Sequence, residues 1–139
     1  MGTIVRPEIS EKSKYWISKH RHYELKHFCL QYPMWKQLHA DCLDLGVSAS
    51  RISGMPSVRL SVDPTAKYAL KRTYYADRIK MVEEAALEAD RELYQYILRA
   101  VTEGLSYTYL KTRLEIPCTR DMYYDRYRRF FWLLSEMRY

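Results

Sequence analysis

The chain has 139 residues, of which 47% are hydrophobic and 14% aromatic, and only four glycines and five prolines interrupt it. These totals exclude a disordered chain, favour long helices, and suit one domain or a small domain with an accessory helical arm. Because no apolar run approaches about 18 residues and the N-terminus lacks an apolar leader, we expect a soluble, unsecreted protein with no membrane partner. The net charge of +6 and the pI of about 9.2 are compatible with a nucleic-acid partner, although many basic proteins share them.

The three cysteines, Cys29, Cys42 and Cys118, lie far apart in the sequence. Because their number is odd and they are set in helical patterns, the sequence does not predict a disulfide framework. Their presence fits a reducing cytoplasm better than an oxidising compartment.

The N-terminal part of the chain predicts two helices. The first runs from about residue 13 to residue 31, through the basic segment KHRHYELKH. Pro33 opens the second helix, because a proline at the first helical position loses no hydrogen bond. An apolar stripe then recurs at spacings of three, four and three residues: Trp35, Leu38, Cys42 and Leu45. Gly46 stands where a C-terminal cap belongs, so residues 1–46 are predicted to form a helical hairpin for partner contact or dimerisation.

Residues 47–63 break this pattern, because serine, glycine and proline are frequent there. The segment is long for a turn inside one domain, so we predict a linker and a domain boundary. A second domain, residues 64–139, then starts at a strong helix signal. Asp63 is the predicted N-cap and Pro64 the first helical residue.

The central helix is predicted to run from Pro64 to about Ala89. Its narrow apolar seam packs on a partner helix, and packing within the monomer is favoured over packing across a dimer. The seam consists of Ile79, Val82, Ala86 and Ala89. Asp90 then caps a further helix or marks a kink, and Gly104 caps the end of that helix.

The last third of the chain has the sequence outline of a helix-turn-helix, at about residues 106–137. Ser106 starts a short helix that reaches Leu114, and Pro117 prevents this helix from continuing through the turn. Ile116 fills the turn, and Thr119 caps a final helix that extends to about Met137. In such an arrangement the second helix is presented to the major groove of DNA. No strand-type alternation of useful length occurs, and the predicted fold class is all-α.

The final helix has two predicted faces. One covers the core and consists of Tyr123, Tyr127, Phe130, Phe131 and Leu134. The other carries the candidate DNA contacts. We expect the residues of the first turn and a half to read base edges: Arg120, Asp121 and Tyr124. We expect phosphate contacts from Thr119, Arg126, Arg128, Arg129, Lys111 and Arg113. An amphipathic helix with arginines on a solvated face is the competing interpretation.

The segment YTYLKTRLEIPCTRDMYYDRYRRFFWLL resembles the helix-turn-helix of sigma-factor region four, with the threonine and following arginine of that motif at Thr119 and Arg120. The segment YPMWKQLHADCLDL, the linker and a helix starting DPT precede it, and this order is similar to that of small phage transcriptional regulators of the RinA and ArpU type. Only about thirty residues carry motif specificity. The resemblance implies a DNA-binding regulator from a phage or mobile element, acting in the cytoplasm of a bacterial host. Arg126 departs from the pattern, which has an aliphatic residue there.

Other sites are less favoured. His27, Cys29, His39 and Cys42 could be brought together as a zinc site, but His27 and Cys29 diverge on a helix and Cys42 belongs to an apolar stripe. His20 and His22 could add a pH-dependent positive patch, against a simple solvated face. No catalytic triad, carboxylate pair or phosphate loop is present in the sequence. We therefore predict no enzyme activity, no cofactor and no metal.

The function predicted from the sequence is sequence-specific binding of double-stranded DNA in transcription control. The N-terminal hairpin is expected to contact a second protomer or RNA polymerase. The alternative is a phage-borne interaction protein that binds and blocks a host protein, such as a defence nuclease, with its aromatic and arginine surface.

Overall fold

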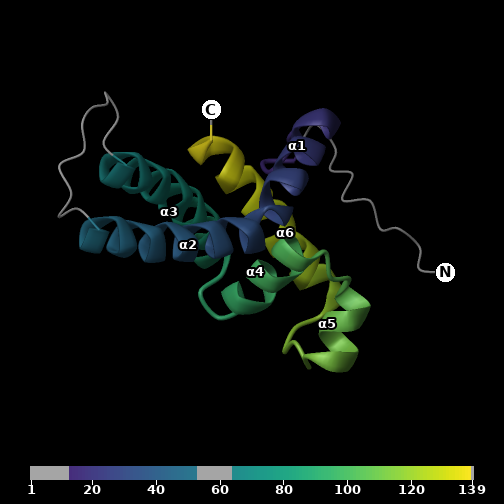
Figure 1. The fold of residues 1–139 in the computed structure, drawn as a ribbon. Coiled ribbons are helices and arrows are strands. Elements are labelled where there is room, and N and C mark those ends of the chain that lie inside the picture. Colours follow the sequence, from purple (N-terminus) through teal and green to yellow (C-terminus); the bar gives the residue numbers. More distant parts are fainter. Residues whose placement is uncertain (1–12, 53–63, 139) are drawn as a thin grey trace. The chain divides into compact units, whose positions relative to one another are not determined.

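A computed structural model describes residues 13–52 and 64–138, with side chains for 13–43 and 65–138. Within these ranges the protein is all-α and has no strand, as the sequence predicts (Figure 1). The described helices are α1 (Lys19–Leu30), α2 (Tyr32–Ile52), α3 (Pro64–Ala89), α4 (Tyr94–Glu103), α5 (Tyr107–Arg113) and α6 (Arg120–Met137). None of them combines the length and the apolar character that crossing a bilayer requires.

Most helix ends in the C-terminal half follow the predicted signals, but the predicted cap at Asp90 is wrong, because α4 begins at Tyr94 and its N-cap, Leu93, makes no side-chain cap. α3 spans Pro64–Ala89, although its predicted cap, Asp63, lies outside the described residues. Gly104 ends α4 in the left-handed conformation, with φ of 72°. The side chains of Ser106 and Thr119 accept hydrogen bonds from the first turns of α5 and α6. Local capping chemistry therefore determines where these helices start and stop.

Two predicted boundaries in the N-terminal half are wrong. α1 begins at Lys19, capped by Ser18, rather than at about residue 13. α2 begins at Tyr32, one residue before Pro33, and continues through Gly46 to Ile52. The predicted cap at Gly46 and the start of the linker at residue 47 therefore fall inside a helix, because a glycine is tolerated there at moderate cost. Residues 53–63 lie outside the described ranges, and the proposed division into domains remains a prediction.

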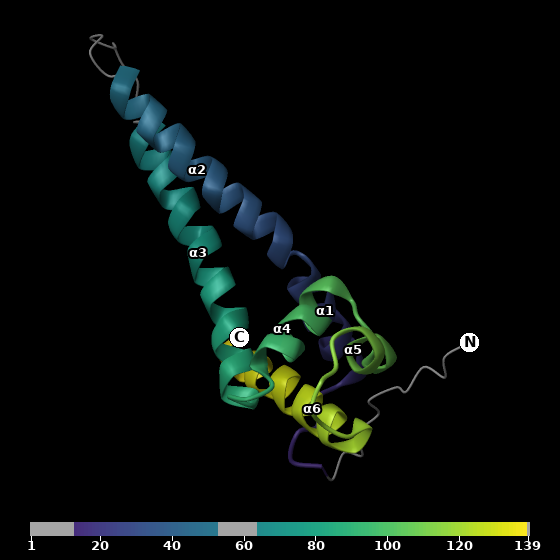
Figure 2. The same ribbon diagram turned by 90° about the horizontal axis from the view of Figure 1, so that it is seen from below.

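The chain packs into two compact units, with boundaries at residues 31/32 and 80/81. Unit 1 combines α1 with the end of α3 and with α4, α5 and α6. Unit 2 contains α2 and the first part of α3. Unit 1 is therefore assembled from two segments that are distant in the sequence, and Figure 2 shows α1, α4, α5 and α6 gathered together.

The core of unit 1 lies where α1 and α4 pack on each other and on α6. The large side chains that are fully buried in this unit come from all of these helices, from the end of α3, from α5 and from the turn before α6: Leu25, Cys29, Val82, Ile97, Leu110, Ile116, Tyr123, Phe130, Phe131 and Leu134. Each such apolar side chain contributes about 1.5–3 kcal/mol when it leaves water. The predicted core face of α6 is confirmed for Tyr123, Phe130, Phe131 and Leu134, whereas Tyr127 is half-buried.

Arg21 ties α1 to the C-terminal end of α6. Its Nε donates to Ser135 Oγ at 3.2 Å, and its Nη2 donates to the carbonyls of Ser135 and Arg138. Its Nη1 is paired with Glu24 at 2.6 Å. The guanidinium of Arg138 in turn lies 4.2 Å from the centre of the Phe28 ring. α1 is thus an integral part of unit 1, joined to α6 by both apolar packing and hydrogen bonds.

Candidate nucleic-acid interface

The turn between α5 and α6 is held by hydrogen bonds on both sides. The Ile116 N–H donates to the Leu110 carbonyl at 3.0 Å, and the Ile116 side chain is buried, as predicted. Tyr107 Oη donates to the Cys118 carbonyl at 2.7 Å. Glu115 adopts a positive φ of 54°, which few non-glycine residues do. These contacts fix the direction in which the chain enters α6.

The start of α6 presents two predicted base-reading residues to solvent. Thr119 Oγ1 accepts from the Met122 N–H at 3.2 Å, so the cap uses one of the orphan donors of the first turn. Arg120 and Asp121 follow and are both exposed. The remaining donors and the helix dipole favour an anion such as a phosphate at this end, and the carboxylate of Asp121 in the first turn opposes part of that effect.

Tyr124, the third predicted base contact, is half-buried among aromatic rings. Its ring centre lies 5.1 Å from that of Tyr123 and 6.0 Å from that of Tyr127. Tyr107 joins the same cluster at 5.5 Å from Tyr123. Burial, together with the neighbouring Tyr127 and Tyr124, raises the pKa of Tyr123 above its ordinary value. The cluster therefore anchors the start of α6, and Tyr124 contributes to that anchoring.

Arg126, one of the predicted phosphate contacts, is held within unit 1. Its Nε donates to Asp90 Oδ2 at 2.9 Å, and its Nη1 lies 2.5 Å from Asp125 Oδ2. The hydrogen bond to Asp90 raises the pKa of Arg126, and Asp125 adds to the effect. The departure from the region-four pattern at this position thus coincides with an ion pair that joins α6 to the turn between α3 and α4.

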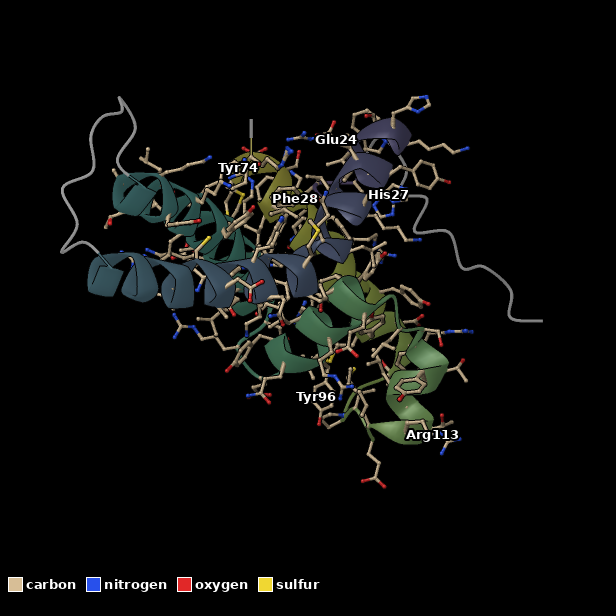
Figure 3. All side chains as sticks on the ribbon, in the orientation of Figure 1. Glu24, His27, Phe28, Tyr74, Tyr96 and Arg113 are labelled. Carbon is tan, nitrogen blue, oxygen red and sulfur yellow. The ribbon has the colours of Figure 1, made fainter. Side chains whose placement is uncertain are left out.

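The other predicted phosphate contacts are more accessible. Lys111 and Arg113 are exposed on α5, and Figure 3 shows Arg113 at the end of this helix, far from Glu24 on α1. Lys111 lies close enough to the turn to lower the pKa of Cys118, although burial raises that pKa more strongly. Arg128 and Arg129 are half-exposed on α6. Arg129 Nε is buried and has no hydrogen-bond partner among the described residues.

His22 lies against the aromatic core. In the sequence, only its helical spacing from the neighbouring apolar residues indicates this position. Its ring centre is 4.8 Å from that of Phe131, in an edge-to-face arrangement. Burial lowers the pKa of His22, and Lys26 lowers it further, so the ring is neutral near pH 7. His22, Leu25 and Cys29 recur at helical spacing on one face of α1, and this stripe indicates packing.

The candidate zinc site finds no support among the described side chains, because no three of their histidines, cysteines and carboxylates are grouped to hold a metal ion. Cys29 is buried, and its burial raises the pKa of its thiol. A buried, protonated thiol is a poor metal ligand and packs as a small apolar group.

Comparisons with protein-family models, with curated proteins and with solved structures found no match to this chain.

Proposed function

We propose that the chain is a sequence-specific double-stranded DNA-binding regulator of transcription from a phage or mobile element, similar in kind to the RinA and ArpU regulators, and that it acts in the bacterial cytoplasm. The observation that carries the proposal is the start of α6. A threonine-capped helix follows a hydrogen-bonded turn and leaves Arg120 and Asp121 exposed. This is the arrangement by which a recognition helix reaches base edges.

Each accessible residue has a proposed task. Arg120 donates to a guanine edge or a phosphate, and Asp121 orients it or accepts from a cytosine amino group. Lys111 and Arg113 on α5, with Arg128 and Arg129 on α6, neutralise phosphates on either side. Arg126 is left out of this set because Asp90 and Asp125 already hold its guanidinium.

The proposal involves no catalysis and no cofactor, and it assigns partner contact to the exposed apolar residues of α1 and α2. α1 packs in unit 1 through Leu25, Phe28 and Cys29, but its Tyr23 and Leu30 are exposed. α2 exposes Met34 and Leu43. Contact with a second protomer or with RNA polymerase is therefore proposed for these exposed side chains.

Selection of bound duplexes from a random library tests the proposal. The wild-type protein should enrich one sequence family, and Arg120→Ala should lose about 1–3 kcal/mol on the enriched site and accept other bases at one position. Arg99→Ala is the control, because Arg99 is an exposed arginine of α4 whose partner is Glu103. Enrichment of no sequence by the wild-type protein contradicts sequence-specific binding.

One observation favours the alternative function, an inhibitor that binds a host protein. Asp121, Asp125, Arg128 and Arg129 recur at helical spacing on one face of α6, so this face mixes both signs of charge. A face with both signs of charge complements a protein surface better than it complements the uniform negative charge of DNA. A stable complex with a host protein, and no retention of duplex DNA at low salt, is the result expected from this alternative.

A further inference from the structure

The positive charge of α3 is concentrated in its first part. Residues 64–80 carry five basic side chains, Lys67, Lys71, Arg72, Arg78 and Lys80, against one acidic side chain, Asp77. Residues 81–104 carry two basic side chains against six acidic ones. Summed over 67–104 the charges cancel, so a count over the whole segment conceals this division. Local net charge, rather than the total, is the signal for a binding surface.

Four residues of this part of α3 share one face of the helix. Lys67, Lys71, Tyr74 and Arg78, which we call the α3 strip, recur at spacings of four, three and four residues. At 1.5 Å per residue the strip is about 16 Å long. Lys67 and Lys71 are exposed, and half of the Tyr74 surface is accessible. Tyr74 is labelled on α3 in Figure 3.

Within the strip, the aromatic ring of Tyr74 contacts the guanidinium of Arg78. Arg78 Cζ lies 3.3 Å from the centre of the Tyr74 ring, and Arg78 Nη1 donates to the Tyr74 carbonyl at 3.2 Å. This stacking holds the guanidinium along the helix surface, and it leaves other donors of the planar group available to an anion. Tyr74 also meets Tyr75 edge-to-face at 5.4 Å.

The strip lacks internal counter-charges. Elsewhere in the described chain, Arg21, Arg99 and Arg126 are each paired with a carboxylate. Across the described residues no carboxylate pairs with Lys67, Lys71 or Arg78. Three cations on one face repel one another, and this repulsion is relieved when an external anion binds.

We propose that the α3 strip binds the phosphate backbone of duplex DNA, as a second surface that adds affinity without reading sequence. The inference rests on the proposed function, because it takes duplex DNA as the ligand. A row of cations about 16 Å long matches about five base pairs of a polyanion that carries one charge per about 1.7 Å of axis. Leu70, beside the strip, is 73% exposed. An exposed apolar side chain next to a row of cations also suits an acidic protein surface, which is the competing occupant.

Binding of a random-sequence duplex, measured by fluorescence anisotropy over a range of salt concentrations, tests the strip in the full-length chain. The double variant Lys67→Gln/Lys71→Gln removes two phosphate contacts and should lower the steepness of log Kd against log salt by about 1.8. It should weaken binding equally on random and selected duplexes. The control Lys19→Gln/Lys26→Gln removes the same charge from exposed positions on α1, and its slope should match that of the wild type.

The outcomes separate the strip from the helix-turn-helix. If the strip variant weakens all duplexes and Arg128→Gln does not, the strip inference holds and the proposed role of α6 fails. If the strip variant and the α1 control behave like the wild type while Arg120→Ala loses the selected site, the strip inference is overturned and the proposed function stands. Equal weakening by the strip variant and the α1 control, or capture of an acidic protein but no duplex through the strip, also overturns it. Unchanged far-UV circular dichroism of the variants shows that they fold.

Discussion

Asp90 joins the turn between α3 and α4 to the middle of α6. Its Oδ1 accepts from the backbone N–H groups of Glu92 and Leu93 at 2.8 and 2.9 Å, and its Oδ2 meets Arg126 at 2.9 Å. Partial burial raises the pKa of Asp90, but the Leu93 N–H, Arg126 and the Glu92 N–H lower it more, so the net pKa lies below the ordinary value. The side chain is only 12% exposed, so this ion pair is shielded better than a surface pair.

The first prediction concerns this carboxylate. Asp90→Asn keeps an acceptor for the two N–H groups but removes the charge that pairs with Arg126, so the free energy of unfolding at pH 7 should fall by about 1–3 kcal/mol. Because the pKa of Asp90 is lowered in the folded state, its stabilisation is present above the unfolded pKa and is lost as the pH falls through the folded pKa. Urea unfolding should therefore show the wild type and the variant converging below about pH 4.

Glu92→Gln is the matched control for Asp90→Asn. It removes a neighbouring carboxylate that is exposed, and it should change stability by less than about 0.5 kcal/mol at any pH. A loss of stability in Asp90→Asn that stays constant down to pH 3 would show that the charge of Asp90 is not the cause.

Among the helices, two glycines have opposite roles: Gly104 ends a helix, whereas Gly46 lies inside one. Gly104 ends α4 with φ of 72°, and a Cβ at this position would meet only Leu30 Cδ2, at 3.8 Å. Space is therefore available, and the backbone conformation alone requires glycine. Gly46 lies inside α2, which extends to Ile52. There a glycine only lowers the intrinsic stability of the helix.

The second prediction is that alanine has opposite effects at these two positions. Gly46→Ala should raise the helix content and stabilise α2 by up to about 1 kcal/mol. Gly104→Ala should destabilise unit 1 by about 1–2 kcal/mol, because a side chain disfavours the left-handed conformation. Thermal unfolding followed by far-UV circular dichroism measures both. Destabilisation by Gly46→Ala would indicate that α2 ends at Gly46, as the sequence pattern predicts.

The elements that the sequence predicts well are those whose ends depend on neighbouring residues. Ser106, Thr119 and Gly104 act through hydrogen bonds or dihedrals within a few residues, so a local pattern is sufficient to place α5, α6 and the end of α4. The predicted cap at Gly46 is wrong, because glycine is compatible with both a helix cap and a helix interior. The ion pair of Arg126 with Asp90 has no signal in the local sequence pattern, because the two residues lie 36 positions apart.

Over the whole chain, unit 1 is completed by contacts between α1, near the N-terminus, and the C-terminal end of α6. Arg21 contacts Ser135 and Arg138, which are 114 and 117 residues away. No periodicity within a short window carries information on such contacts, so the sequence could not show that α1 packs on α4 and α6. The predicted grouping of α1 with α2 in one hairpin followed sequence proximity, whereas the two helices belong to different compact units, with the boundary after residue 31.

The third prediction concerns this long-range assembly. A chain of residues 32–139 lacks Leu25, Phe28 and Cys29 of the core, so unit 1 should lose cooperative unfolding. A peptide of residues 13–31, added in excess, should restore it by mass action. Calorimetry and near-UV circular dichroism measure the recovery. The same peptide with Leu25→Ala and Phe28→Ala is the control and should not restore the transition. Cooperative unfolding of the shortened chain alone would contradict an essential role for α1.

Because α1 and α6 are far apart in the sequence, they are also synthesised at different times. α1 is synthesised before any residue of α4 or α6. At roughly 5–20 residues per second, about 5–20 s pass before its partners on α6 exist. During this interval the apolar face of α1, with Leu25 and Phe28, has no native surface to cover it. α6 therefore reaches its native packing against α1 only after translation has passed Leu134.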